Sequence, residues 1–280
     1  MNGADHNAVL SIAGGGNMAR ALIAGLIAHG RDPLSIRVGE PDALQRATLA
    51  QEFPGIAVHS DNVAAMRDAP LWVLAVKPQH MAAAALQLAA QARLQRPLIL
   101  SLAAGTRIKA LRNWFGEDVI IVRCMPNRAA MLGAGITGLF APEGTPAHAL
   151  ASADALFAEV GSTVWVADET DMDTVTAVSG GGPAYVFLLI ELLEEAAIAE
   201  GLAAGVARLL AIEAVAGAAR MARESGVAPA VLRTQITSTA GATAAALAVL
   251  DDAGVRPAFL RAVHAARLRS AEMAAQARDK

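Results

Sequence analysis

A short apolar run that ends at three consecutive glycines constrains the fold of this chain more than any other feature. Residues 7–24 read N-A-V-L-S-I-A-G-G-G-N-M-A-R-A-L-I-A. Residues 9–13 have the composition of a β-strand, and the apolar residues from Met18 onward recur at helical spacing. The stretch therefore predicts a strand, a tight glycine turn and a helix.

The glycines fit a dinucleotide-binding fingerprint. Gly14, Gly16 and Ala19 occupy the three fixed positions of G-x-G-x-x-G/A, in the strand-turn-helix context that this motif requires. A pyrophosphate can reach the main chain only where no Cβ intervenes, and it is then held by free N–H groups and the helix dipole. A glycine-rich turn can also simply end a strand, but the context favours a nucleotide site.

Strand and helix patterns alternate along the first part of the chain. We expect strands at 9–13, 35–39, 55–59, 71–76, 97–102 and 119–123, with edge strands at 136–140 and 163–166. This alternation predicts a doubly wound, largely parallel sheet of the α/β Rossmann class. The loops that follow the strands then lie along one edge of the sheet, where nucleotides bind.

The second part of the chain has no strand pattern. We expect helices at 183–204, 206–225, 229–235, 240–250 and 257–277. The predicted domains are 1–167, a nucleotide-binding Rossmann domain, and 168–280, an all-α domain that carries substrate and dimerisation surfaces. The helices have more apolar surface than they need within one chain, so we favour burial against a second copy over packing within the chain.

Composition excludes several classes of protein. The net charge of -3 and pI of about 6.1 give no basic field for nucleic acid. Cys124 is the single cysteine, which excludes an intrachain disulfide and a thiolate metal cluster. No secretory signal is evident at 1–7, and Glu191, Glu200 and Arg208 are among the charges that interrupt the apolar runs. We therefore expect a cytoplasmic protein without membrane spans, nucleic-acid partners or metal.

Glu40 bears on the choice of nucleotide. An acid at the end of the second strand commonly binds the adenosine ribose and disfavours a 2′-phosphate, so Glu40 favours NAD over NADP. The nearby Arg37 and Arg46 favour the opposite choice, and Glu40 could equally be a solvated turn residue. Val76 and Lys77 follow a buried strand and are expected to line the same crevice.

Six segments in register resemble pyrroline-5-carboxylate reductase. They are G-G-G-N-M-A at 14–19, A-V-K-P-Q at 75–79, S-L-A-A-G at 101–105, M-P-N at 125–127, T-A-V-S-G-G-G-P-A-Y at 176–185 and T-S-T-A-G-A-T at 237–243. The resemblance implies a Rossmann domain followed by a helical domain that forms a homodimer, with dimers joined into larger rings. It also implies reduction of 1-pyrroline-5-carboxylate to L-proline with NADP or NAD, in reduced form, as hydride donor.

The resemblance also assigns site residues. The cofactor contacts it implies are Gly14, Gly15, Gly16, Asn17, Met18, Glu40, Asn62, Ala75, Val76, Lys77, Pro78, Ala103, Ala104, Gly105 and Asn127. The substrate contacts it implies are Ser179, Ser238, Gly241, Ala242 and Thr243, with Thr243 as the catalytic residue.

Departures from the family pattern lie toward the expected substrate side. They are Arg128 and Ala129 after M-P-N, Gly181 in place of serine, Gly226 in place of an acid, and Thr239 and Ala240 in place of proline and glycine. Two alternatives therefore stay open. One is a diverged relative that acts on another cyclic imine or a hydroxyacid, and the other is a protein that binds nucleotide without turnover.

Three segments have two readings each. The stretch 238–243 can hold an anion at a helix start or serve as an ordinary cap. The stretch 179–183 has three glycines followed by Pro183, which is favoured at a first helical position, so it reads as a turn between domains. The resemblance instead implies that it is a wall of the active site. Tyr185 is a possible proton donor, but we favour a packing role for it.

Overall fold

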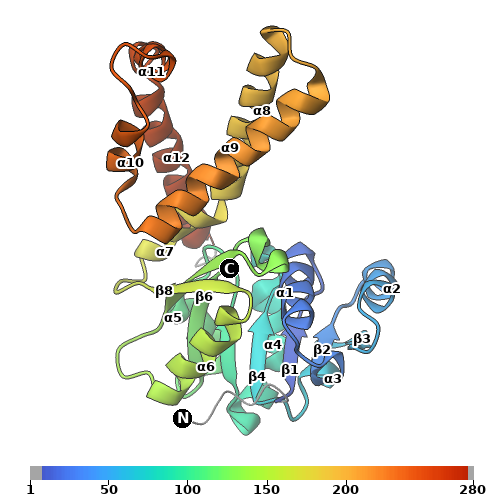
Figure 1. Ribbon diagram of the computed structural model, residues 1–280. Coiled ribbons are helices and arrows are strands. Elements are labelled where there is room, and N and C mark those ends of the chain that lie inside the picture. The colour runs from blue at the N-terminus through green and yellow to red at the C-terminus, as the bar shows by residue number, and fades with distance from the viewer. Residues whose placement is uncertain (1–7, 277–280) are drawn as a thin grey trace. The chain divides into compact units, whose positions relative to one another are not determined.

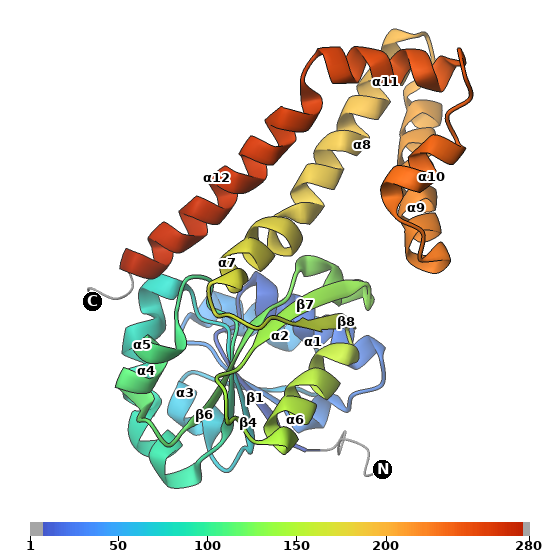
Figure 2. The same cartoon turned by 90° about the vertical axis from the view of Figure 1, so that its left-hand side faces the viewer.

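The computed structural model describes residues 8–276 and divides the chain into two compact units (Figures 1 and 2). One unit contains the residues up to Gly181 together with those from Ala266 onward. The other runs from Gly182 to Ala265. The segment 1–7, where a secretory signal would lie, is outside the described residues.

The first unit is built on one eight-stranded sheet in the order β3-β2-β1-β4-β5-β6-β7-β8. Its strands are β1 Leu10–Ala13, β2 Ile36–Gly39, β3 Ala57–His59, β4 Leu71–Leu74, β5 Leu98–Ser101, β6 Ile120–Met125, β7 Gly135–Phe140 and β8 Gly161–Trp165. All neighbours are parallel except β6 and β7. The first six strands follow the Rossmann order, which confirms the predicted fold class and sets the switch point between β1 and β4.

Helices cover both faces of this sheet. They are α1 Asn17–Ala28, α2 Ala43–Glu52, α3 Asn62–Met66, α4 Pro78–Gln95, α5 Ile108–Phe115, α6 Ala147–Ala158 and α7 Asp171–Val175, with the 3₁₀ turns η1 Pro33–Ser35 and η2 Arg128–Leu132. Alternate residues of one strand enter different cores. Val73 packs with α1 and α6, whereas Trp72 packs with α4 and α5. Strands buried on both faces explain the continuous apolar runs in the sequence.

The second unit is helical. Its helices are α8 Gly182–Ala199, α9 Ala204–Ser225, α10 Pro229–Gln235, α11 Ala242–Asp252 and α12 Val255–Gln276, the last of which ends in the first unit. Helices α8 and α9 pack against each other. Tyr185 is half-buried and meets Phe259 edge to face, with ring centroids 5.8 Å apart, in agreement with a packing role.

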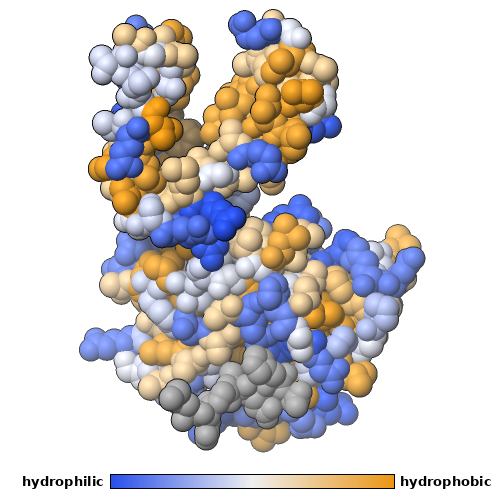
Figure 3. Space-filling view, viewed as in Figure 1, coloured by the Kyte–Doolittle hydropathy of each residue, from blue (hydrophilic) through white to orange (hydrophobic). Residues whose placement is uncertain are grey.

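Much of the apolar surface of the helical unit is exposed. None of the side chains of α8 is buried within the chain, and Phe187 is 67% exposed. Figure 3 shows hydrophobic residues gathered over α8 and α9. Exposed patches of this size mark surfaces that another protein covers.

Two expectations about the start of the helical region were wrong. The boundary between the two units does fall within 179–183, after Gly181, but the backbone there is not a glycine loop, because one turn of π-helix, η3 at Thr176–Gly180, leads from α7 into α8. The apolar runs are also less interrupted than we expected. Among the described residues the continuous helical stretch Asp171–Ala199, which comprises α7, η3 and α8, is long and apolar enough to cross a membrane by length and composition.

Candidate active site

The glycine turn lies at the switch point of the sheet. Gly14 has a φ of +91°, which disfavours any other residue. A Cβ on Gly14 would lie 3.0 Å from the backbone nitrogen of Val76 and 3.1 Å from the carbonyl carbon of Ala75. The structure thus brings together two of the segments that the sequence assigns to the cofactor.

The start of α1 is open to a ligand. A Cβ on Gly16, the residue before α1, would meet nothing within 4 Å. No side chain of the described residues caps this helix, and its first backbone bond runs from the N–H of Arg20 to the carbonyl of Gly16. The N–H groups of Asn17 and Met18 precede that bond, so they are available to an anion. These features fit the pyrophosphate of a dinucleotide.

Glu40 supports this turn from the neighbouring strand. Its carboxylate accepts a 2.8 Å hydrogen bond from the N–H of Gly15 and a 2.9 Å bond from that of Asp42. The side chain is buried, so the reading of Glu40 as a solvated turn residue was wrong. Gly15 is closely packed, since a Cβ there would lie 2.4 Å from Leu49 Cδ1 and the Leu49 side chain would have to move.

The adenosine side of the crevice contains a buried polar atom without a partner in the described chain. Asn62 Oδ1 is buried and unpaired, and it lies 2.4 Å from where a Cβ on Gly39 would be. Such groups are costly unless a ligand or water satisfies them, which fits a cofactor contact at Asn62. Arg46 donates to the carbonyls of Glu40 and Pro41, so its positive charge lies beside the same turn.

The loop after β5 packs against the end of α12. Gly105 has a φ of +74°, and a Cβ there would lie 3.0 Å from the backbone nitrogen of Ala274. The side of Gly105 that lacks a Cβ therefore lies against the backbone of α12. Ala104 is partly exposed on the same loop, whereas Ala103 is buried.

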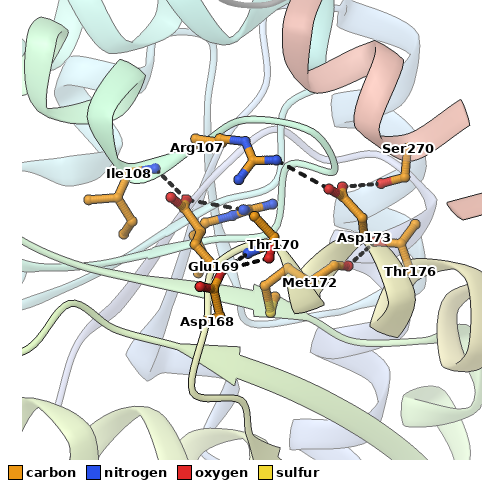
Figure 4. Close-up of polar contacts among 10 residues, drawn as sticks. Arg107, Ile108, Asp168, Glu169, Thr170, Met172, Asp173, Thr176 and Ser270 are labelled. Atoms are coloured by element: carbon orange, nitrogen blue, oxygen red, sulfur yellow. Dashed lines mark hydrogen bonds and ion pairs between the residues drawn. The ribbon is translucent and has the colours of Figure 1, made fainter. Parts of the chain in front are cut away.

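A partly buried network of ion pairs begins just after this loop, at Arg107 and Ile108 (Figure 4). Glu169 Oε1 accepts a 2.7 Å bond from the N–H of Ile108, at the start of α5, and pairs with Arg123 of β6 at 3.1 Å. Burial lowers the pKa of Arg123, and the charge of Glu169 opposes that shift. The pair joins the start of α5 to the middle of the sheet.

Asp173 forms the second half of the network. Its Oδ2 pairs with Arg107 at 3.3 Å, and its Oδ1 accepts a 2.7 Å bond from the hydroxyl of Ser270 on α12. None of these residues was predicted from the sequence. The available signal was Arg123, a charge within an apolar strand, which must find a partner when buried.

The M-P-N segment meets the π turn. Asn127 Nδ2 donates a 3.1 Å bond to the carbonyl of Ser179, and Asn127 Oδ1 accepts from the N–H of Ile136 at 3.4 Å. Both polar atoms of this side chain therefore have protein partners. Ser179 was assigned to the substrate, and its hydroxyl donates to the carbonyl of Val175 at 2.9 Å.

The remaining substrate residues gather at the start of α11 in the helical unit. Gly241 precedes this helix, and no side chain of the described residues caps it. A Cβ on Gly241 would lie 2.2 Å from Ser238 Oγ, which accounts for glycine there. Ser238, Ala242 and Thr243 are exposed. The free first N–H groups of α11 and the exposed hydroxyls beside them are compatible with the anion-binding reading.

The exposed Lys77 and the partly exposed Val76 and Pro78 complete the predicted cofactor set at the start of α4. Among residues 8–276 no group of three or more His, Cys, Asp or Glu side chains could hold a metal ion.

The Rossmann order of the sheet, with the glycine turn at its switch point, places this chain in the class of nucleotide-dependent oxidoreductases. The family model described as NADP oxidoreductase coenzyme F420-dependent matches residues 9–105, and the model described as pyrroline-5-carboxylate reductase dimerisation matches residues 169–273.

Relatives and solved structures agree with these matches. The chain is 42% identical over 267 residues to pyrroline-5-carboxylate reductase of Pseudomonas aeruginosa, covering 95% of this chain and 97% of the relative. A structure of the reductase from Coxiella burnetii superposes with a TM-score of 0.87 at 36% identity, covering 95% and 98%. The Plasmodium falciparum enzyme with NADP bound gives 0.87 at 26% identity, covering 97% and 100%. This chain belongs to the pyrroline-5-carboxylate reductase family.

The family match explains the apolar helices. The dimerisation model spans α8 to α11 and most of α12, where the exposed apolar side chains lie. The protein is thus a homo-oligomer through its helical region, as the sequence predicted.

Proposed function

We propose that this protein reduces 1-pyrroline-5-carboxylate to L-proline with NADPH or NADH. The family relationship over nearly the whole chain carries this proposal. The glycine turn falls within the matched segment 9–105, and the loop 238–243 falls within the matched segment 169–273. Both binding elements therefore belong to the matched regions.

The reaction needs little acid-base chemistry from the protein. When bound, the reduced nicotinamide supplies a hydride to the imine carbon. Once the ring nitrogen is protonated, that carbon is already electrophilic, so proximity and alignment are the main requirements. The C=N electron pair then goes to the nitrogen, which keeps its proton. The reaction therefore requires neither a catalytic triad nor a metal.

The start of α1 holds the nucleotide in this proposal. The N–H groups of Asn17 and Met18 bind the pyrophosphate, and Gly16 leaves room for it. Asn62 binds on the adenosine side through its unpaired oxygen. The segment 75–78 and the loop at 103–105 line the path of the cofactor beyond the switch point.

The start of α11 holds the substrate. Its free N–H groups and the hydroxyls of Ser238 and Thr243 bind the carboxylate, and the methylene ring needs only apolar contact. Thr243 is the residue that we assign to the reacting end of the substrate.

The same proposal covers the organisation of the protein. It divides the chain at 167/168 into a nucleotide-binding domain and a helical domain, and it joins dimers into a ring. It also places the protein in the cytoplasm, without membrane, nucleic-acid or metal partners.

The test is substrate-dependent oxidation of NADPH and NADH, followed by Thr243→Ala. We expect oxidation only with pyrroline-5-carboxylate, and at least a ten-fold loss of kcat/KM in Thr243→Ala. Thr234→Ala is the matched control, because Thr234 is an exposed threonine whose hydroxyl bonds within α10. A protein that binds nucleotide without any substrate-dependent oxidation would refute the proposal.

A further inference from the structure

Pro183, just after the π turn η3, removes one backbone N–H that an α-helix would use. In an α-helix the carbonyl of Ser179 would accept from the N–H of the residue four positions later. That residue is Pro183, which has no N–H. The break is visible in the backbone, where the N–H of Gly181 bonds to the carbonyl of Thr176 at 3.0 Å, five residues back.

Asn127 supplies the missing donor. Its Nδ2 lies 3.1 Å from the carbonyl oxygen of Ser179, and its Oδ1 accepts from the N–H of Ile136. These two partners fix the orientation of the amide, because one is an acceptor and the other a donor. Asn127 is only 8% exposed, so water has little access to compete for the bond.

The neighbouring residues also seat the turn on this segment. A Cβ on Gly180 would lie 3.0 Å from Met125 Cε, so the backbone of η3 packs closely on the end of β6. The segment 125–127 leaves the sheet at the edge where Rossmann proteins bind nucleotide. Asn127 is therefore placed to set the position of Ser179 relative to that edge.

We propose that Asn127 is a positioning residue, whose side-chain amide replaces the backbone donor absent at Pro183 and so holds Ser179 in place for the substrate. This rests on the proposed function, because Ser179 matters for turnover only if the protein is a reductase. The resemblance implied that Asn127 contacts the cofactor. In this proposal Asn127 instead acts through Ser179 and does not contact the cofactor. Pairing of buried polar groups at a π turn fits the frequent use of such turns at functional sites.

The test is a double-mutant cycle between Asn127→Ala and Pro183→Ala. Asn127→Ala is expected to lower kcat/KM for pyrroline-5-carboxylate by about ten-fold while KM for the nucleotide changes less than two-fold. Pro183→Ala restores a backbone N–H four residues after Ser179, where an α-helical bond would have its donor, so the double variant should recover to within about three-fold of Pro183→Ala alone. Asn113→Ala, which changes an exposed asparagine on α5, is the control and should leave both kcat/KM for pyrroline-5-carboxylate and KM for the nucleotide unchanged.

Two results would overturn the proposal. One is a rise in KM for the nucleotide that accounts for the whole loss in Asn127→Ala, since that would make Asn127 a cofactor contact. The other is a folded double variant that is no better than Asn127→Ala. The same cycle measured by thermal unfolding needs no turnover. If the wild-type protein lacked activity but Pro183→Ala still restored the melting temperature lost in Asn127→Ala, the hydrogen-bond relationship would stand and the proposed function would fail.

Discussion

Ser270 donates a 2.7 Å hydrogen bond to the Asp173 carboxylate, across 97 residues of sequence. Both residues are buried. Asp173 lies on α7, just before the chain enters the helical unit, and Ser270 lies on α12, just after the chain leaves it. The bond therefore joins the two segments that connect the helical unit to the sheet-containing unit.

Removal of this bond should destabilise the protein. Ser270→Ala leaves Oδ1 of Asp173 buried without its donor, so we expect a loss of about 1–3 kcal/mol in the free energy of unfolding. Urea denaturation at one fixed protein concentration measures it, because oligomerisation makes stability depend on concentration. Ser152→Ala removes an exposed hydroxyl that bonds within α6 and should cost under about 0.5 kcal/mol. Equal losses in the two variants would contradict the role of the bond.

Replacement of Ala240 by glycine should stabilise the substrate loop. Ala240 has a φ of +58°, a left-handed conformation that costs roughly 1–2 kcal/mol for a residue with a Cβ, whereas glycine adopts it freely. Part of that gain is offset because glycine makes the unfolded chain more flexible. We therefore expect Ala240→Gly to raise the free energy of unfolding by up to about 1 kcal/mol. Ala245→Gly inside α11 should lower it by about 1 kcal/mol, and stabilisation by both changes would count against backbone strain at 240.

The charge of Glu40 should control the choice between the two nucleotides. Glu40→Gln keeps the shape of the side chain and removes the negative charge beside the ribose, while Arg46 stays in place. We expect the ratio of kcat/KM for NADPH to that for NADH to rise several-fold. Glu143→Gln, in the exposed loop between β7 and α6, is the control and should leave the ratio unchanged. If the ratio does not change in Glu40→Gln, the charge of Glu40 does not control the choice of nucleotide, and its role is only to accept the hydrogen bond from the Gly15 N–H.

Cys124 should be inert in the folded protein. It is fully enclosed in β6, and burial raises the pKa of its thiol well above the ordinary value, which keeps it protonated at neutral pH. We expect alkylation by iodoacetamide to follow unfolding, so that it is slow in buffer and fast in denaturant. Rapid labelling of the native protein would contradict the burial.

The sheet could be predicted from the sequence because its signals are local. Each central strand is an apolar run buried on both faces, and the glycine turn after β1 stands between a strand pattern and a helix pattern. The start of α11 was also predictable, since serine, threonine and glycine precede an alanine-rich run. These features depend on neighbouring residues alone.

The rest depends on long-range contacts. The three glycines at 180–182 indicated a turn, but the bond from Asn127 and the packing of Met125 stabilise a π turn there. The partnership of Ser270 with Asp173 has no periodic signature, since either residue alone resembles an ordinary surface residue. Glu40 was expected to face the ribose, yet its carboxylate also binds the backbone of the glycine turn, which only the fold brings near.

The most direct test of the central claim follows the hydride itself. The protein is incubated with pyrroline-5-carboxylate and NADPH or NADH carrying deuterium at the transferable position, and the product is analysed by mass spectrometry and NMR. We predict one L-proline for each nucleotide oxidised, with deuterium on the former imine carbon. Nucleotide oxidation without labelled proline, or no oxidation at all, would contradict the account.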